Sequence, residues 1–161
     1  MKTILAPIDF SSASDAVVKE ASVLARAVNG RVVLLTVVQP PVVMAEYAAL
    51  MGSIAEITTA GEKSATRLLG KIEAKLKAES VPAESVQVVG PPVMHIVEQA
   101  AACDADYIVM GSHGHTAFYD LLVGSTTHGV LMRAKCPVVI VPAEKDTQPA
   151  KRKSAARPAS R

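Results

Sequence analysis

Three glycines and a serine in the last third of the chain have a spacing that suits phosphate binding. Two residues separate Gly111 from Gly114, nine more precede Gly124, and Ser125 follows directly. Glycine lets a backbone N–H approach an anion because no Cβ stands in the way. The residues after Ser125 resemble the start of a helix, whose first N–H groups are unpaired and attract negative charge. The pattern predicts a phosphate-binding loop between a strand and a helix.

Ser125 has two predicted roles in this loop. Its side chain is expected to cap the helix, and its hydroxyl is expected to donate to a phosphate oxygen. A simple turn between a strand and a helix is the alternative for the first glycine pair. The third glycine, followed by Ser-Thr-Thr, favours phosphate binding.

A carboxylate and an apolar wall are expected beside this loop. Asp9 follows the first apolar run directly, and the second run ends at Thr36-Val37-Val38. In an open parallel sheet, ligands bind beyond the carboxyl ends of the strands, where the strand order reverses. A carboxylate, an apolar wall and a phosphate-binding loop together indicate a nucleotide pocket. The alternative for Asp9 is a cap of the helix that follows Ser11-Ser12.

Five apolar runs alternate with helical patterns and must position these residues. The runs are continuous, which is typical of strands covered on both faces of a parallel sheet. They are Thr3–Ile8, Val32–Val38, Ser85–Val89, Tyr107–Met110 and Pro137–Val141. Between them, helical periodicity covers residues 13–28, with a cap at Ser12, then 65–76, 91–100 and a segment after Ser125 that buries Val130, Leu131 and Ala134. The alternation predicts an α/β fold, a three-layer sandwich with right-handed crossovers. Residues 40–60 are expected to form a partly helical excursion that covers a site or contacts a partner.

Composition limits the class of protein. A chain of 161 residues with 50% hydrophobic residues predicts one domain with a full core. No apolar stretch reaches the ~18 residues of a membrane span, and the first residues do not resemble a secretion signal. Cys103 and Cys136 fit no metal-binding spacing, so we expect buried free thiols in a reducing compartment. The predicted location is therefore cytoplasmic.

The basic residues gather at the end of the chain. From Lys145 onward the chain has six basic residues and one acidic residue, whereas residues 1–144 have 11 basic and 14 acidic. We predict a folded domain over 1–143 and a basic, disordered tail over 144–161. A solubilising extension is favoured over a weak contact with nucleic acid or an anionic surface, because the tail lacks aromatic residues.

These motifs resemble the universal stress protein family over residues 1–143. The resemblance rests on Pro7-Ile8-Asp9, the spaced glycines and the final run 136–142. It implies a five-stranded parallel sheet of order 3-2-1-4-5, like that of adenine nucleotide alpha hydrolases, and membership of an ATP-binding subclass. It also implies a homodimer paired through Pro137, Val138, Val139, Ile140 and Val141. By position, the residues implied to contact nucleotide are Pro7, Asp9 and Val37 at adenine and ribose, Met110 and Gly111 at ribose, and Gly114, Gly124, Ser125 and Thr126 at phosphates.

One position departs from the resemblance. Family members often have Arg or Lys after the second glycine, where this chain has His115. A neutral histidine neutralises phosphate less than arginine does, so AMP, ADP or a cyclic nucleotide remain alternatives to ATP, which is expected with or without Mg²⁺. A metal site through His113, His115 and His128 is a minor alternative, because no Cys or carboxylate spacing completes it.

Enzymatic activity stays open. The chain has no Gly-rich motif ending in Gly-Lys-Ser/Thr, no Gly-x-Ser-x-Gly and no His-Glu-x-x-His. A nucleotide-binding regulatory protein of stress response is the leading hypothesis. A slow ATPase is the second hypothesis, and a protein-interaction module is the third.

Overall fold

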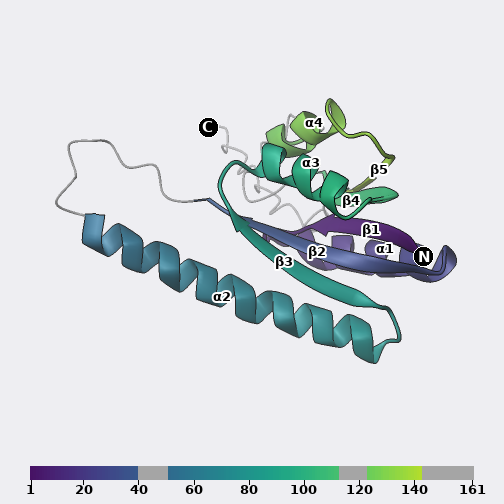
Figure 1. Ribbon diagram of the computed structural model, residues 1–161, viewed down its shortest axis with the longest axis horizontal. Helices are drawn as coiled ribbons and strands as arrows, with labels where there is room; N and C mark the ends of the chain where they lie inside the picture. The colour runs from purple at the N-terminus through teal and green to yellow at the C-terminus, as the bar shows by residue number, and fades with distance from the viewer. Residues whose placement is uncertain (40–50, 113–122, 143–161) are drawn as a thin grey trace, which may run out of the picture.

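In the computed structural model, five strands form one parallel sheet in the order β3-β2-β1-β4-β5 (Figure 1). The strands are β1 (Lys2–Pro7), β2 (Gly30–Val38), β3 (Ala83–Val89), β4 (Tyr107–Gly111) and β5 (Val138–Val141). The structure describes residues 1–39, 51–112 and 123–142, and the side chains of 51–58 are not part of that description. Each predicted strand agrees with an observed one to within a few residues. The implied strand order is confirmed.

In the described residues, four helices connect the strands: α1 (Ser14–Ala27), α2 (Met51–Ala78), α3 (Pro92–Ala102) and α4 (Ser125–Leu131). All four were predicted, with differences at their ends. The helix α2 begins at Met51, so residues 51–60 of the predicted excursion belong to it, whereas 40–50 lie outside the described residues. Leu131, the last residue of α4, was predicted to be buried, but it is 42% exposed. The predicted tail also lies outside the described residues.

The helices cover both faces of the sheet. On one face, α1 and α2 pack on a core that includes Ile4, Val32 and Leu69. On the other face, α3 and α4 pack on a core that includes Leu5 and Val33. Successive strand residues point to opposite faces, so a strand covered on both faces needs apolar residues at every position. This explains the continuous apolar runs of the sequence.

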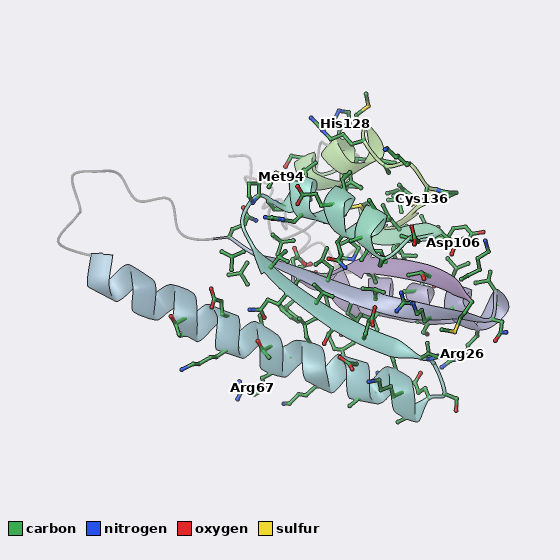
Figure 2. The ribbon with its side chains drawn as sticks, in the orientation of Figure 1. Arg26, Arg67, Met94, Asp106, His128 and Cys136 are labelled. Carbon is green, nitrogen blue, oxygen red and sulfur yellow. The ribbon has the colours of Figure 1, made fainter. Side chains whose placement is uncertain are left out.

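Both cysteines are free thiols, as predicted, but they are half-buried rather than fully buried. Each packs against the core beneath α3 and α4, and Cys136 lies just before β5 (Figure 2). Burial raises the pKa of the Cys103 and Cys136 thiols, which disfavours the reactive thiolate. Across the described parts of the chain, every helix is too short or too polar to cross a membrane.

Candidate functional site

A cavity of about 410 Å³ lies at the carboxyl ends of β1, β2 and β4. The strand β1 pairs with β2 on one side and with β4 on the other. The chain therefore leaves β1 toward β2 across one face of the sheet and later reaches β4 across the opposite face. Such a reversal of strand order opens a crevice between the two connections, which is where open α/β sheets bind ligands.

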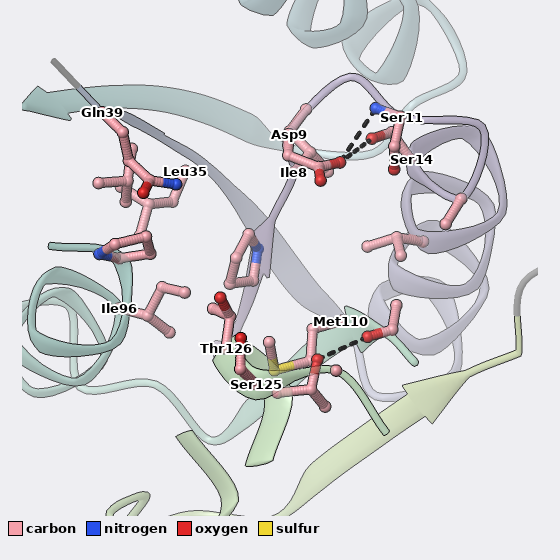
Figure 3. Close-up of a pocket in the computed structure, with 18 residues that line it drawn as sticks. Ile8, Asp9, Ser11, Ser14, Leu35, Gln39, Ile96, Met110, Ser125 and Thr126 are labelled. Carbon is pink, nitrogen blue, oxygen red and sulfur yellow. Dashed lines mark hydrogen bonds between the residues drawn. The ribbon is translucent and has the colours of Figure 1, made fainter. Parts of the chain in front are cut away.

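Eight of the nine predicted site residues line this cavity (Figure 3). They are Pro7, Asp9, Val37, Met110, Gly111, Gly124, Ser125 and Thr126. They come from the ends of three strands and from the first turn of α4, so positions more than a hundred residues apart in sequence meet at one site. The ninth, Gly114, lies outside the described residues, as do His113 and His115.

The cavity also has walls that the sequence did not predict. Ser11, Ser14 and Val17 line it from α1 and the loop before it, whereas Pro92 and Ile96 line it from α3. Helical periodicity identified the apolar stripes of these helices but not which end of each stripe would face a cavity. Strand periodicity could have identified two of the missed residues. Leu35 and Gln39 lie two positions before and after the predicted Val37, so they point to the same face, and both line the cavity.

Asp9 organises the loop that leads into α1. Its Oδ1 accepts a hydrogen bond from the Ser11 N–H at 3.0 Å and one from the Ser14 hydroxyl at 3.3 Å. The intervening Phe10 has a left-handed backbone with φ of 60°. The helix itself begins after Ala13 without a side-chain cap, so the predicted cap at Ser12 is wrong. Asp9 thus fixes a turn and lines the cavity at the same time.

Among the described residues, three hydrogen bonds hold the two ends of the connection between β4 and α4. The Thr127 hydroxyl donates to the Gly111 carbonyl at 2.8 Å, and the Gly124 N–H donates to the Ser112 carbonyl at 2.7 Å. The Ser112 N–H in turn donates to the Val141 carbonyl at 2.8 Å. These bonds fix the first turn of α4 at the edge of the cavity.

The N-cap of α4 differs from the prediction. Gly124 occupies the cap position with extended backbone, φ −64° and ψ 157°, and no side chain caps the helix. Ser125 is instead the first helical residue, and it is exposed. The predicted capping role of Ser125 is therefore wrong. The first N–H groups of a helix have no partner within the helix, and here this turn borders the cavity.

The cavity offers hydroxyls and apolar surface but little charge. Among its described lining residues, Asp9 is the single ionisable side chain. His128, considered as a metal ligand, is exposed on α4 (Figure 2). Within residues 1–39, 51–112 and 123–142, no three His, Cys, Asp or Glu side chains come together in a group that could hold a metal ion.

Comparison with known proteins agrees with this architecture. The model of the universal stress protein family matches residues 1–142. Universal stress protein MJ0577 of Methanocaldococcus jannaschii is 30% identical over 152 residues, which span 87% of this chain and 94% of the relative. The solved structure of UspA from Lactobacillus plantarum is 25% identical with a TM-score of 0.78, covering 87% of this chain and 97% of that one.

A further solved structure is a universal stress protein in complex with cAMP. It is 26% identical to this chain with a TM-score of 0.65, and the match covers 88% of this chain and 97% of that one. The family model, a relative matched over nearly its whole length and the shared fold all agree on one family. The chain belongs to the universal stress protein family.

Proposed function

We propose that this protein binds an adenine nucleotide in the cavity and serves a regulatory role in stress response. The observation that supports this proposal is the convergence of eight predicted residues on one cavity at the reversal of the strand order. The volume of about 410 Å³ lies within the usual range of ligand pockets, roughly 300–1,000 Å³. The relative solved with cAMP supports a nucleotide as the ligand.

The proposed orientation follows the chemistry of the walls. Pro7 and Val37 provide apolar surface for the base, and Asp9 provides a carboxylate for the ribose hydroxyls. Gly124 and Ser125, with Thr126 and Gly114, are assigned to the phosphates, and Met110 and Gly111 to the ribose. In this orientation the phosphates meet backbone N–H groups and hydroxyls at the start of α4.

The charge of the cavity bears on the number of phosphates. No Lys or Arg is present among the described lining residues, and His115 occupies the position at which the family resemblance led us to expect a cation. Each added phosphate then gains little from pairing with a protein cation. ATP, with or without Mg²⁺, is the proposed ligand. We expect its affinity to exceed that of ADP, AMP or cAMP by a small factor only.

Assembly and location complete the proposal. The strand β5 lies at the edge of the sheet, with β4 as its neighbour. An edge strand presents unpaired N–H and C=O groups, and pairing with a second copy satisfies them by a two-fold operation. We propose a homodimer through residues 137–141. The free thiols of Cys103 and Cys136 support a reducing, cytoplasmic location.

Identification of the bound nucleotide tests the function. Freshly purified protein is denatured, the released small molecules are identified, and calorimetry then measures the affinity for ATP, ADP, AMP and cAMP. A turnover assay on the same sample separates binding from slow hydrolysis. We expect an adenine nucleotide in the released fraction and saturable binding. Failure to bind any of the four nucleotides would overturn the proposal.

A variant at the phosphate end of the cavity tests where the nucleotide binds. The extended backbone of Gly124 suits any residue, so Gly124→Val should fold normally while placing a branched side chain at the phosphate end. We expect a loss of nucleotide affinity with adenosine binding largely retained, because adenosine has no phosphate. Unchanged ATP affinity in this variant would place the ligand elsewhere.

A further inference from the structure

The end of the cavity between β2 and α3 has a distinct composition. Alternate residues at the end of β2 and just beyond it line this end: Leu35 is fully buried, Val37 is half-buried, and Gln39, the residue after β2, is exposed. Pro92 and Ile96 of α3 form the wall across from them. This end is therefore an apolar slot with one carboxamide at its mouth.

The polar groups of the cavity are divided among three regions. Asp9, Ser11 and Ser14 belong to the α1 side, whereas Ser125 and Thr126 belong to the α4 side. Figure 3 shows Gln39 on the side of Leu35, away from both groups. Of the described lining residues, Gln39 alone brings a polar side chain to the apolar slot.

The backbone of Gln39 is held in place on one side. The preceding Val38 pairs with Val89 of β3, and its carbonyl accepts a hydrogen bond from the Gly90 N–H at 2.9 Å. Within the part of the chain that the structure describes, the Gln39 carboxamide makes no hydrogen bond. A side chain on a fixed strand end, with its donor and acceptor available, is suited to ligand recognition.

We infer that Gln39 recognises the 6-amino group of the base. This inference rests on the proposed function and extends it from nucleotide binding to base selection. A carboxamide offers one acceptor and a pair of donor hydrogens in one plane. Adenine offers the complementary groups along two of its edges, because an N6–H donor lies beside a ring-nitrogen acceptor, N1 or N7, on each side of the amino group. Leu35, Val37 and Ile96 supply the apolar contact to the ring, and Gln39 supplies the paired hydrogen bonds.

A comparison of two ligands and two variants tests this assignment. The probes are AMP and purine riboside 5′-monophosphate, which differ only in the 6-amino group, and calorimetry measures both affinities. We expect the wild-type protein to prefer AMP on the order of fivefold, since a neutral hydrogen bond contributes about 1 kcal/mol. Gln39→Leu removes the carboxamide and should bring the two affinities together. Gln39→Glu offers acceptors only, so it should weaken AMP binding while keeping the size of the side chain.

A control variant distinguishes base selection from general loss of binding. Thr126→Val alters the α4 side of the cavity and should weaken both ligands by the same factor, which leaves the preference for AMP intact. Melting curves verify that each variant is folded. If the wild type binds both ligands equally, or if Gln39→Leu keeps the preference, Gln39 does not recognise the base and the nucleotide proposal stands. If the wild type binds neither ligand nor any other nucleotide, the proposed function itself fails.

Discussion

The hydroxyl of Thr127 donates a 2.8 Å hydrogen bond to the carbonyl of Gly111, which joins the first turn of α4 to the last residue of β4. Thr127 is only 4% exposed, and both residues line the cavity. The bond spans 16 positions in the sequence. It fixes where the proposed phosphate-binding turn begins relative to the end of the strand.

Replacement of Thr127 by valine should therefore affect both stability and binding. Valine keeps the shape of threonine but leaves the Gly111 carbonyl without this donor, so we expect a loss of about 1–2 kcal/mol in the free energy of unfolding. Nucleotide affinity should fall as well, because the start of α4 loses its anchor. Urea unfolding and calorimetry measure the two effects. The neighbouring Thr126→Val is the control, and we expect it to weaken nucleotide binding with little change in stability. Equal stability of Thr127→Val and Thr126→Val would contradict the anchoring role of Thr127.

Asp9 has two roles that different substitutions can separate. Asp9→Ala removes the acceptor of the Ser11 N–H and the Ser14 hydroxyl, so it should cost about 1 kcal/mol of stability and also weaken ATP and AMP alike. Asp9→Asn keeps an acceptor oxygen for the turn while removing the charge. We expect Asp9→Asn to keep most of the stability and still to lose affinity. Melting curves and binding curves of the two variants test this. If both variants bind nucleotide with wild-type affinity, Asp9 stabilises the turn but does not contact the ligand.

The proposed dimer depends on the exposed position of β5. Val139 is 38% exposed, whereas Val138 and Ile140 pack against the core beneath α3 and α4. Val139→Asp should therefore leave the monomer folded and break the dimer, because it places an unpaired charge opposite its symmetry copy. Light scattering at micromolar concentrations measures the change from dimer to monomer.

A matched control for this prediction lies on the opposite edge of the sheet. Val89 at the end of β3 is 44% exposed, and Val89→Asp should leave the dimer intact. A monomeric wild-type protein would contradict the dimer outright. Dissociation by both substitutions would point to an interface that is not confined to β5.

The start of the sheet supplies a pH-dependent contribution to stability. Asp106, labelled in Figure 2, accepts hydrogen bonds from the Lys2 ammonium at 2.6 Å and from the Thr3 N–H at 2.8 Å. These partners hold the pKa of the Asp106 carboxyl below its ordinary value of 3.8. A carboxyl with a lowered folded-state pKa stabilises the fold fully above the unfolded pKa, and this stabilisation is lost as the pH falls through the folded pKa.

Asp106→Asn should therefore destabilise the protein at pH 7 and pH 5, and the difference from the wild type should shrink below about pH 4. Lys2→Met should show the same trend, since it removes the charged partner of that carboxylate. Urea unfolding at a series of pH values measures this. If the difference in unfolding free energy between the wild type and Asp106→Asn stays constant from pH 7 to pH 3, the charge of Asp106 does not contribute to stability.

Much of the fold could be predicted because its signals are local. The strands follow from continuous apolar runs, and α1 follows from apolar residues that recur every three or four positions. The strand order was available through resemblance to a family. Phosphate binding, which the glycine spacing predicts, stays a prediction, because residues 113–122 of that loop lie outside the described residues. The predicted ends of the helices were less accurate, as at Ser12 and Ser125. Several neighbouring residues can cap a helix, and tertiary packing selects one of them.

The sequence by itself thus determined the type and order of the elements, the parallel sheet and eight of the eighteen residues that line the cavity. Only the tertiary structure decided that Pro92 and Ile96 oppose β2, that Gly124 rather than Ser125 caps α4, and that Val139 is the exposed residue of β5. Periodicity is a property of one segment and shows which of its residues share a face. The surroundings of that face depend on strand register and on how each helix lies across the sheet, which are set by contacts between segments far apart in the chain.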